Sequence, residues 1–255
     1  MIWINGTYKE NECALSVFDK SNLGMSVFTT ALAREDKIEN WTEHLARVRK
    51  HAKLMDLDCL YSDLQLTQVA QGLISEKKFE FSAVRIQISA GCGARGLEYP
   101  ENVTVILTCT KSGNPDEAPS AAVWLEAEYR RNETDPTSRI KSGNYGASAL
   151  IRKHAKQRGY DDVIFLNTKG QVTCASTSNL ILEINGGLIT PPLEDGVMDG
   201  IARAELIKSY SVSEQSVSEQ DLMAAKYIWL VNSFGKRPVV KIGEVFKETK
   251  PLAPS

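Results

Sequence analysis

Lys141 is the residue of this chain that is best placed for covalent chemistry with a small molecule. It lies in SRIKSGNYGASALIRKH, between a predicted strand and a predicted helix, where a side chain can project into an interdomain cleft. A lysine amine can form an imine with an aldehyde and, once released, can move a proton at the neighbouring carbon. A lysine in a loop is usually a solvated surface residue, so other motifs must decide between these interpretations.

Arg47 and the segment GIAR (200–203) indicate a binding site for an anion. A guanidinium such as that of Arg47 can hold a phosphate or carboxylate through two parallel hydrogen bonds. GIAR opens a predicted helix, and the backbone amides of Ile201 and Ala202 would point outward from its N-terminus. Taken alone, these features are a surface arginine and an ordinary start of a helix.

Two predicted turns that contain Ser and Asn complete the set of candidate motifs, one in STSNL (176–180) and one in NSFGKRPV (232–239). Such turns are common for purely structural reasons, so their order along the chain carries more information than their composition. Seven segments follow one another: VFTT (27–30), HLAR (44–47), KSGNY (141–145), STSNL (176–180), TPP (190–192), GIAR (200–203) and NSFGKRPV (232–239).

This ordered set resembles the class IV aminotransferase-like family of fold-type IV pyridoxal-phosphate enzymes, which contains branched-chain and D-amino-acid aminotransferases and aminodeoxychorismate lyase. The resemblance spans residues 2–240, nearly the whole chain. It implies an α/β (α+β) fold with a smaller N-terminal α/β domain and a larger C-terminal domain whose sheet forms a pseudo-barrel. It also implies pyridoxal 5'-phosphate as cofactor, a small-molecule amino substrate and a homodimer.

The resemblance assigns roles to individual residues. Lys141 would hold the cofactor and then move the substrate proton. The other implied cofactor contacts are Arg47 with the amides of Ile201 and Ala202 at the phosphate, Ser178 and Asn179 beside the ring, and Asn232 and Ser233 near the phosphate and the substrate carboxylate.

Cys174 is the main departure from the family pattern. Five residues before the asparagine of the SxSN segment, the family usually has a glutamate that pairs with the pyridine nitrogen, whereas this chain has Cys174. A neutral thiol stabilises a pyridinium less than a carboxylate does, so the ring would be a weaker electron sink. This departure argues against transamination, and it is also compatible with an inactive relative in which Cys174 is a small buried side chain.

Other differences favour the lyase branch of the family. LGMSVFTT has Thr29 where aminotransferases commonly have glutamate, and SAGCGARG and NSFGKRPV resemble the lyases. Ala202 replaces a frequent threonine, a loss of about 0.5 to 1.5 kcal/mol at most. The resemblance therefore implies a lyase that converts 4-amino-4-deoxychorismate to p-aminobenzoate and pyruvate, with Thr30 assisting the leaving group. The alternatives are a D-amino-acid or branched-chain aminotransferase and a catalytically inactive relative.

Hydrophobic periodicity predicts the elements that position these residues. The polar segment KSGNPDEAPS suggests an interdomain linker at 113–120, between an N-terminal domain (1–112) and a C-terminal domain (121–255). Helices are expected at 42–55, capped by Thr42, at 62–77 and at 144–159. Strands are expected at 27–33, 37–41, 84–88, 103–109, 122–129, 162–166, 172–175, 180–184 and 227–231.

Composition limits the other possible functions. The net charge is −2 and the basic residues are dispersed, which makes a nucleic-acid partner improbable. No leader-like N-terminus and no run of about 18 apolar residues occur, so we expect a cytoplasmic protein without a membrane anchor. The five cysteines show no zinc-binding spacing, and we expect no metal.

Two further motifs have ordinary interpretations. Gly91, Gly93 and Gly96 spell GxGxxG, but a strand is predicted to follow, so we expect a hairpin-like loop and no dinucleotide site. The three histidines, His44, His51 and His154, lie on predicted helices, where surface or capping roles are expected.

Overall fold

The computed structural model describes residues 1–10 and 15–252. The chain divides into two compact units. The N-terminal unit contains Met1–Asn114 together with Lys141–Asn144, and the C-terminal unit contains Pro115–Ile140 and Tyr145–Ser255. The four residues that begin with the candidate lysine therefore belong to the N-terminal unit, although the chain on both sides of them belongs to the C-terminal unit.

The N-terminal unit is built on a six-stranded antiparallel sheet with the order β2-β1-β6-β5-β3-β4. Its strands are β1 (Ile2–Ile4), β2 (Thr7–Lys9), β3 (Ser26–Arg34), β4 (Lys37–Ile38), β5 (Phe81–Ser89) and β6 (Thr104–Lys111). β5 and β6 are antiparallel neighbours, so the GxGxxG segment lies in the loop between two strands, as the sequence predicts.

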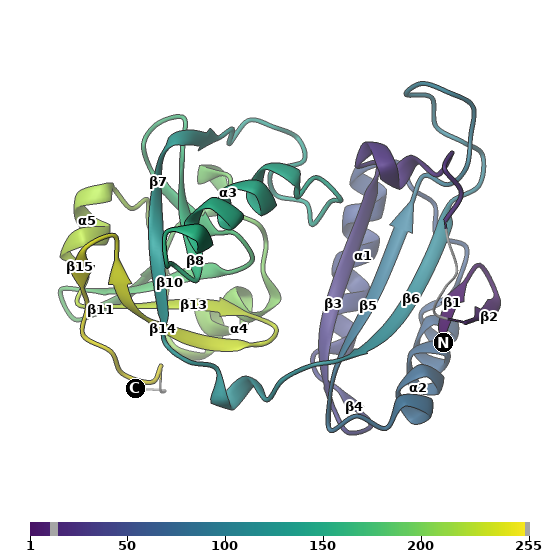
Figure 1. Cartoon of the computed structure of the whole chain (residues 1–255), viewed down its shortest axis with the longest axis horizontal. Helices are drawn as coiled ribbons and strands as arrows, with labels where there is room; N and C mark the ends of the chain where they lie inside the picture. The colour runs from purple at the N-terminus through teal and green to yellow at the C-terminus, as the bar shows by residue number, and fades with distance from the viewer. Residues whose placement is uncertain (11–14, 253–255) are drawn as a thin grey trace. The chain divides into compact units, whose positions relative to one another are not determined.

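Two helices, α1 (Trp41–Leu54) and α2 (Asp63–Lys77), pack on this sheet (Figure 1). α2 begins with a capping box between Ser62 and Gln65. The predictions that Thr42 caps α1 and that a strand runs to Trp41 are wrong. Asn40 occupies the N-cap position in a left-handed conformation, with φ of 48°, which a short polar side chain tolerates. A short 3-10 helix, η1 (Lys20–Leu23), precedes β3.

The C-terminal unit contains a nine-stranded mixed sheet with the order β12-β11-β10-β13-β14-β7-β8-β9, in which β15 also pairs with β14. β9 contacts β10 although the two strands are far apart in this order, so the sheet curls. The prediction of an α/β fold with a pseudo-barrel sheet is confirmed. The strands are β7 (Ala121–Arg131), β8 (Asp162–Asn167), β9 (Val172–Ala175), β10 (Asn179–Ile184), β11 (Gly187–Thr190), β12 (Ser213–Glu214), β13 (Tyr227–Asn232), β14 (Gly235–Ile242) and β15 (Val245–Phe246).

Three α-helices accompany this sheet, and α4 and α5 contact its strands β13 and β10 (Figure 1). None of the helices in residues 1–10 and 15–252 is both long and apolar enough to cross a membrane. The helices are α3 (Gly146–Gln157), α4 (Ile201–Ser209), α5 (Glu219–Ala224) and two 3-10 turns, η2 (Pro115–Glu117) and η3 (Leu193–Asp195).

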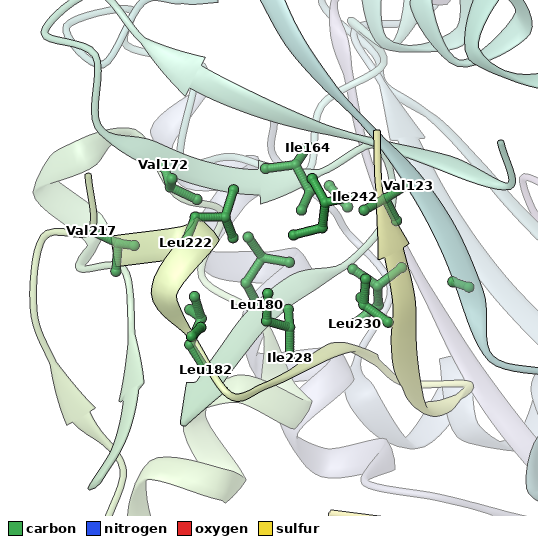
Figure 2. Packing of buried hydrophobic residues seen from close by; sticks show 14 of the residues in the cluster. Val123, Ile164, Val172, Leu180, Leu182, Val217, Leu222, Ile228, Leu230 and Ile242 are labelled. Atoms are coloured by element: carbon green, nitrogen blue, oxygen red, sulfur yellow. The ribbon is translucent and has the colours of Figure 1, made fainter. Parts of the chain in front are cut away.

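The inside of the curled sheet is filled with aliphatic side chains (Figure 2). Val123 of β7, Ile164 of β8 and Leu180 of β10 are fully buried there, and Leu230 of β13 and Ile242 of β14 meet them. Burial of one such side chain contributes about 1.5 to 3 kcal/mol. The strands that carry the candidate site residues of this unit are therefore anchored by one common core.

Replacing Leu180 by alanine tests the contribution of this core. Leu180→Ala should lower the free energy of unfolding by about 2 to 5 kcal/mol, because it leaves a cavity among residues that cannot collapse fully. Leu150→Ala, at a position of α3 that is 54% exposed, should change it by less than about 0.5 kcal/mol. Urea unfolding of both variants measures the difference, and equal effects would contradict this description of the core.

Candidate functional site

The segment Lys141–Asn144 is attached to the start of β3. The backbone N–H of Phe28 donates to the Lys141 carbonyl at 2.9 Å, and the N–H of Gly143 donates to the Ser26 carbonyl at 2.8 Å. A Cβ at Gly143 would lie 2.5 Å from Ser26 Oγ, so only glycine fits without a shift of that side chain. The lysine is therefore held by strand-like pairing, although it lies in a connection between two parts of the C-terminal unit.

The amine of Lys141 lies near an aromatic ring and a second cation. Lys141 Nζ is 4.5 Å from the centroid of the Phe28 ring, and Arg85 Cζ is 3.7 Å from the same centroid. Thr30 pairs with Arg85 across β3 and β5, and side chains alternate along a strand, so Phe28, Thr30 and Arg85 share one face of the sheet. Of the two predicted catalytic residues, Thr30 is therefore part of β3, and Lys141 is hydrogen-bonded to the same strand at Phe28.

Arg47 is fixed on the α1 side of β3 by a buried hydroxyl. Arg47 Nη2 donates to Thr29 Oγ1 at 2.8 Å, and Thr29 Oγ1 lies 2.6 Å from His44 Nδ1. A guanidinium can only donate, so the hydroxyl hydrogen of Thr29 is left for the histidine nitrogen. The side chains of Thr29, His44 and Arg47 are all buried. The guanidinium of Arg47 is oriented by its hydrogen bond to the neutral hydroxyl of Thr29.

His44 is uncharged in this arrangement. Burial, together with the cationic side chains of Arg47 and Lys141, lowers the pKa of His44 to about 3. Positive charge is therefore concentrated on Arg47 and Lys141, close to a neutral imidazole. Such a region suits an anion.

The expected surface or capping role is wrong for two of the three histidines. His44 and His51 are each only 1% exposed, whereas His154 is exposed. Together with Arg47 they have the spacing i, i+3 and i+7, which places them along one side of α1. His51 Nδ1 accepts a hydrogen bond from the backbone N–H of Lys141 at 3.1 Å. The spacing of His44 and His51 along the helix could have indicated that both lie on the buried side of α1. Because histidine is polar, an exposed position was predicted instead.

In the C-terminal unit, the predicted phosphate-binding segment forms the closely packed N-terminus of α4. Gly200 is the N-cap residue, and a Cβ there would lie 1.9 Å from Asn179 Oδ1. Asn179 Nδ2 donates to the Met198 carbonyl at 2.9 Å, so this amide positions the chain before the helix. The predicted amide donors, Ile201 and Ala202, are the first two residues of α4.

The two predicted Ser and Asn turns meet. Asn232 Nδ2 donates to Ser178 Oγ at 3.0 Å, and Asn232 Oδ1 accepts from the backbone N–H of Phe234 at 2.7 Å. Ser233 lies half-buried in the turn between β13 and β14. Arg203, the last residue of GIAR, is buried and donates to Glu214, so it ties α4 to β12.

Cys174 has a charged neighbour that the sequence did not indicate. Its thiol is 4% exposed, and Cys174 Sγ accepts from Arg131 Nη1 at 2.9 Å. The guanidinium also lies 5.7 Å from the centroid of the Phe165 ring. The position that the family resemblance places near the ring nitrogen therefore combines a thiol with a cation.

Each unit contains hydrogen-bond donors of a type that a phosphorylated aldehyde requires. The N-terminal unit has an amine and a buried guanidinium, and the C-terminal unit has the amide N–H groups at the start of α4 and a Ser–Asn pair. Across residues 1–10 and 15–252, no three His, Cys, Asp or Glu side chains are grouped as metal ligands. By their chemistry, the donor groups within each unit are of the types that suit an organic cofactor with a phosphate.

The comparison with known families decides the classification. The model of the family "Amino-transferase class IV" matches residues 26–242. The chain belongs to this family. Membership indicates pyridoxal phosphate as the cofactor.

Relatives in the family carry different names. The chain is 25% identical over 258 residues to the aminodeoxychorismate lyase of Bacillus subtilis, covering 96% of this chain and 87% of the relative. It is 26% identical over 200 residues to the branched-chain-amino-acid aminotransferase of Salmonella typhimurium, covering 74% and 65%. A hypothetical aminotransferase from Mycobacterium tuberculosis in its PLP-bound form has the same fold, with a TM-score of 0.85, 21% identity, and coverage of 99% of this chain and 94% of that one.

The neutral state of His44 should appear in the pH dependence of stability. The folded pKa of about 3 lies below the unfolded value near 6.5. Below pH 6.5 the unfolded chain therefore takes up a proton that the folded protein excludes, and stability falls by about 1.4 kcal/mol per pH unit. Between pH 7 and 5, the wild type should lose roughly 2 kcal/mol more than His44→Asn, whose amide oxygen can still accept from Thr29. Urea unfolding at both pH values measures this, and equal losses would contradict a neutral His44.

Proposed function

We propose that the protein is a pyridoxal-phosphate-dependent lyase that converts 4-amino-4-deoxychorismate to p-aminobenzoate and pyruvate. The observation that carries the proposal is the Arg131–Cys174 pair at the position where the family has a carboxylate. With the cofactor bound as the family resemblance implies, this guanidinium would oppose protonation of the pyridine nitrogen and would weaken the capacity of the ring to accept electrons. Cleavage that forms an aromatic product has its own driving force, so it depends less on this capacity than transamination does.

The cofactor contacts of the proposal are those that the family resemblance implies. When bound, pyridoxal phosphate supplies an aldehyde that condenses with amines and a ring that withdraws electrons. In the proposal, Lys141 holds the aldehyde carbon and Arg47 binds the phosphate. The remaining contacts are the amides of Ile201 and Ala202, also at the phosphate, Ser178, Asn179 and Cys174 beside the ring, and Asn232 and Ser233 near the phosphate and the substrate carboxylate.

Lys141 and Thr30 would carry the proton transfers. The amine of Lys141 would remove the C4 proton of the substrate. The electron pair left at C4 would become part of the aromatic system of the substrate ring as the bond between that ring and the enolpyruvyl oxygen breaks. Thr30 assists this departing oxygen, and the enolpyruvate released becomes pyruvate. The centroid of the Phe28 ring lies 4.5 Å from Lys141 Nζ, so this ring forms one side of the surroundings of the amine.

The charges of the N-terminal unit support a substrate with carboxylates. Thr29, which accepts from Arg47, is neutral where the resemblance places a glutamate in aminotransferases, so this position adds no negative charge that would repel a carboxylate. Arg85 lies on the same sheet face as Thr30 and adds a second cation near Lys141. Aminodeoxychorismate carries two carboxylates, and the proposal assigns Arg85 to one of them.

The relatives support the same site for two reactions. The lyase of Bacillus subtilis supports the proposal over nearly the full chain, and the aminotransferase of Salmonella typhimurium favours amino transfer as the second candidate. A small-molecule amino substrate is common to both. We also propose that the protein is a homodimer, because the family resemblance implies one.

Product analysis separates the two reactions. With pyridoxal phosphate and 4-amino-4-deoxychorismate, the wild type should release p-aminobenzoate, and Lys141→Ala should lose about 10²- to 10⁴-fold of the rate, because it lacks the proton carrier. Lys153→Ala, at an exposed position of α3, should keep the wild-type rate. Cys174→Glu should gain amino transfer from glutamate to a keto acid, whereas Cys174→Ser should not.

Each other outcome has a definite meaning. If the wild type catalyses amino transfer and releases no p-aminobenzoate, the lyase proposal is rejected in favour of an aminotransferase. Bound cofactor without either product would indicate the inactive relative.

A further inference from the structure

His51 is a buried residue that has no role in the proposed reaction. It lies on α1, is 1% exposed, and its Nδ1 accepts from the backbone N–H of Lys141 at 3.1 Å. The two residues are 90 positions apart in the sequence. A buried polar side chain that contacts the peptide of the candidate lysine, and not its amine, is suited to positioning.

The geometry of this hydrogen bond fixes the protonation state of His51. A peptide N–H can only donate, so the Nδ1 atom that faces it carries no hydrogen. The ring proton of the neutral imidazole is therefore on Nε2. A doubly protonated His51 could not make this bond, which means that the contact requires the neutral imidazole.

The peptide of Lys141 is held from two elements. Its carbonyl accepts from Phe28 N–H of β3 at 2.9 Å, while its N–H donates to His51 of α1. The next residue, Ser142, forms an antiparallel bridge with Val27. Among these contacts, the one with His51 is made by a side chain, so it can be removed without changing the β3 backbone.

We propose that His51 is a positioning residue, which fixes the backbone of Lys141 so that its amine reaches the aldehyde of the cofactor. The inference rests on the proposed role of Lys141. The amine lies 4.5 Å from the Phe28 ring centroid, and Phe28 is also the β3 residue that binds the Lys141 carbonyl. Rotation of this peptide would move the amine away from the ring. Positioning of a reacting group within a fraction of an ångström is what such supporting contacts provide.

Two ligands distinguish positioning from general structural support. Pyridoxal phosphate can be attached to the lysine, whereas pyridoxamine phosphate has an amine in place of the aldehyde and cannot. Both carry the same ring and phosphate. A defect in the position of Lys141 therefore weakens the first ligand selectively, whereas a distorted site weakens both.

The test measures dissociation constants of both ligands for the full-length wild type and for His51→Leu, His51→Asn and the control His154→Leu. His51→Leu should bind pyridoxal phosphate about tenfold more weakly, the equivalent of one lost hydrogen bond, and pyridoxamine phosphate within twofold of wild type. His51→Asn offers an oxygen near the position of Nδ1 and should restore binding. His154→Leu removes an exposed histidine and should match wild type.

Equal weakening of both ligands by His51→Leu, or no weakening of either, would overturn the proposal. If His51→Leu does not fold, nitrogen NMR of wild type with labelled histidine decides, because the proposal requires an unprotonated, hydrogen-bonded Nδ1 at His51, and a protonated Nδ1 overturns it. A wild type that binds pyridoxal phosphate without a lysine adduct would instead reject the proposed role of Lys141, and this outcome is recognisable before any His51 variant is made.

Discussion

The pairing of the Lys141 peptide with β3 is the constraint on which the rest of the account depends. The chain on both sides of the segment Lys141–Asn144 belongs to the C-terminal unit, but the segment itself is part of the N-terminal unit, where the Lys141 backbone is hydrogen-bonded to Phe28 and His51. A lysine on an unsupported loop would sample many positions, whereas the backbone of this segment is hydrogen-bonded to β3 on both sides of Ser142. The six-stranded sheet and α1 therefore position the backbone of Lys141. Gly143 allows the close approach to Ser26 that this pairing requires.

The position of Lys141 also affects the charges around His44 in the N-terminal unit. Arg47 and Lys141 bring two cations near His44, which responds by remaining neutral. Arg47 donates a hydrogen bond to the neutral hydroxyl of Thr29. In the C-terminal unit, Arg131 beside Cys174 places a cation where the family resemblance predicts an anion. At both positions, a carboxylate of the family pattern is replaced by a neutral side chain that contacts a guanidinium.

Much of the fold could be predicted from local pattern. The limits predicted for β9 agree with the structure, α2 begins after the predicted Ser62, and the α/β class with its curled sheet is confirmed. The short strands β1 and β2 carry too few residues for a period to be visible, and β14 contains Pro238, which interrupts the strand pattern. The limits of the domains and the roles of the site residues remain predictions. The attachment of Lys141 to β3 could not be predicted, because no local pattern reports a contact between residues more than 100 positions apart.

The most direct test of the central claim is to locate the lysine that carries the cofactor. The protein is incubated with pyridoxal phosphate, reduced with borohydride, digested and mapped by mass spectrometry. The account predicts a pyridoxyl group on the peptide that contains Lys141, dependent on reduction and absent from Lys141→Ala. A group on another lysine, or no adduct at saturating cofactor on the folded protein, would contradict it.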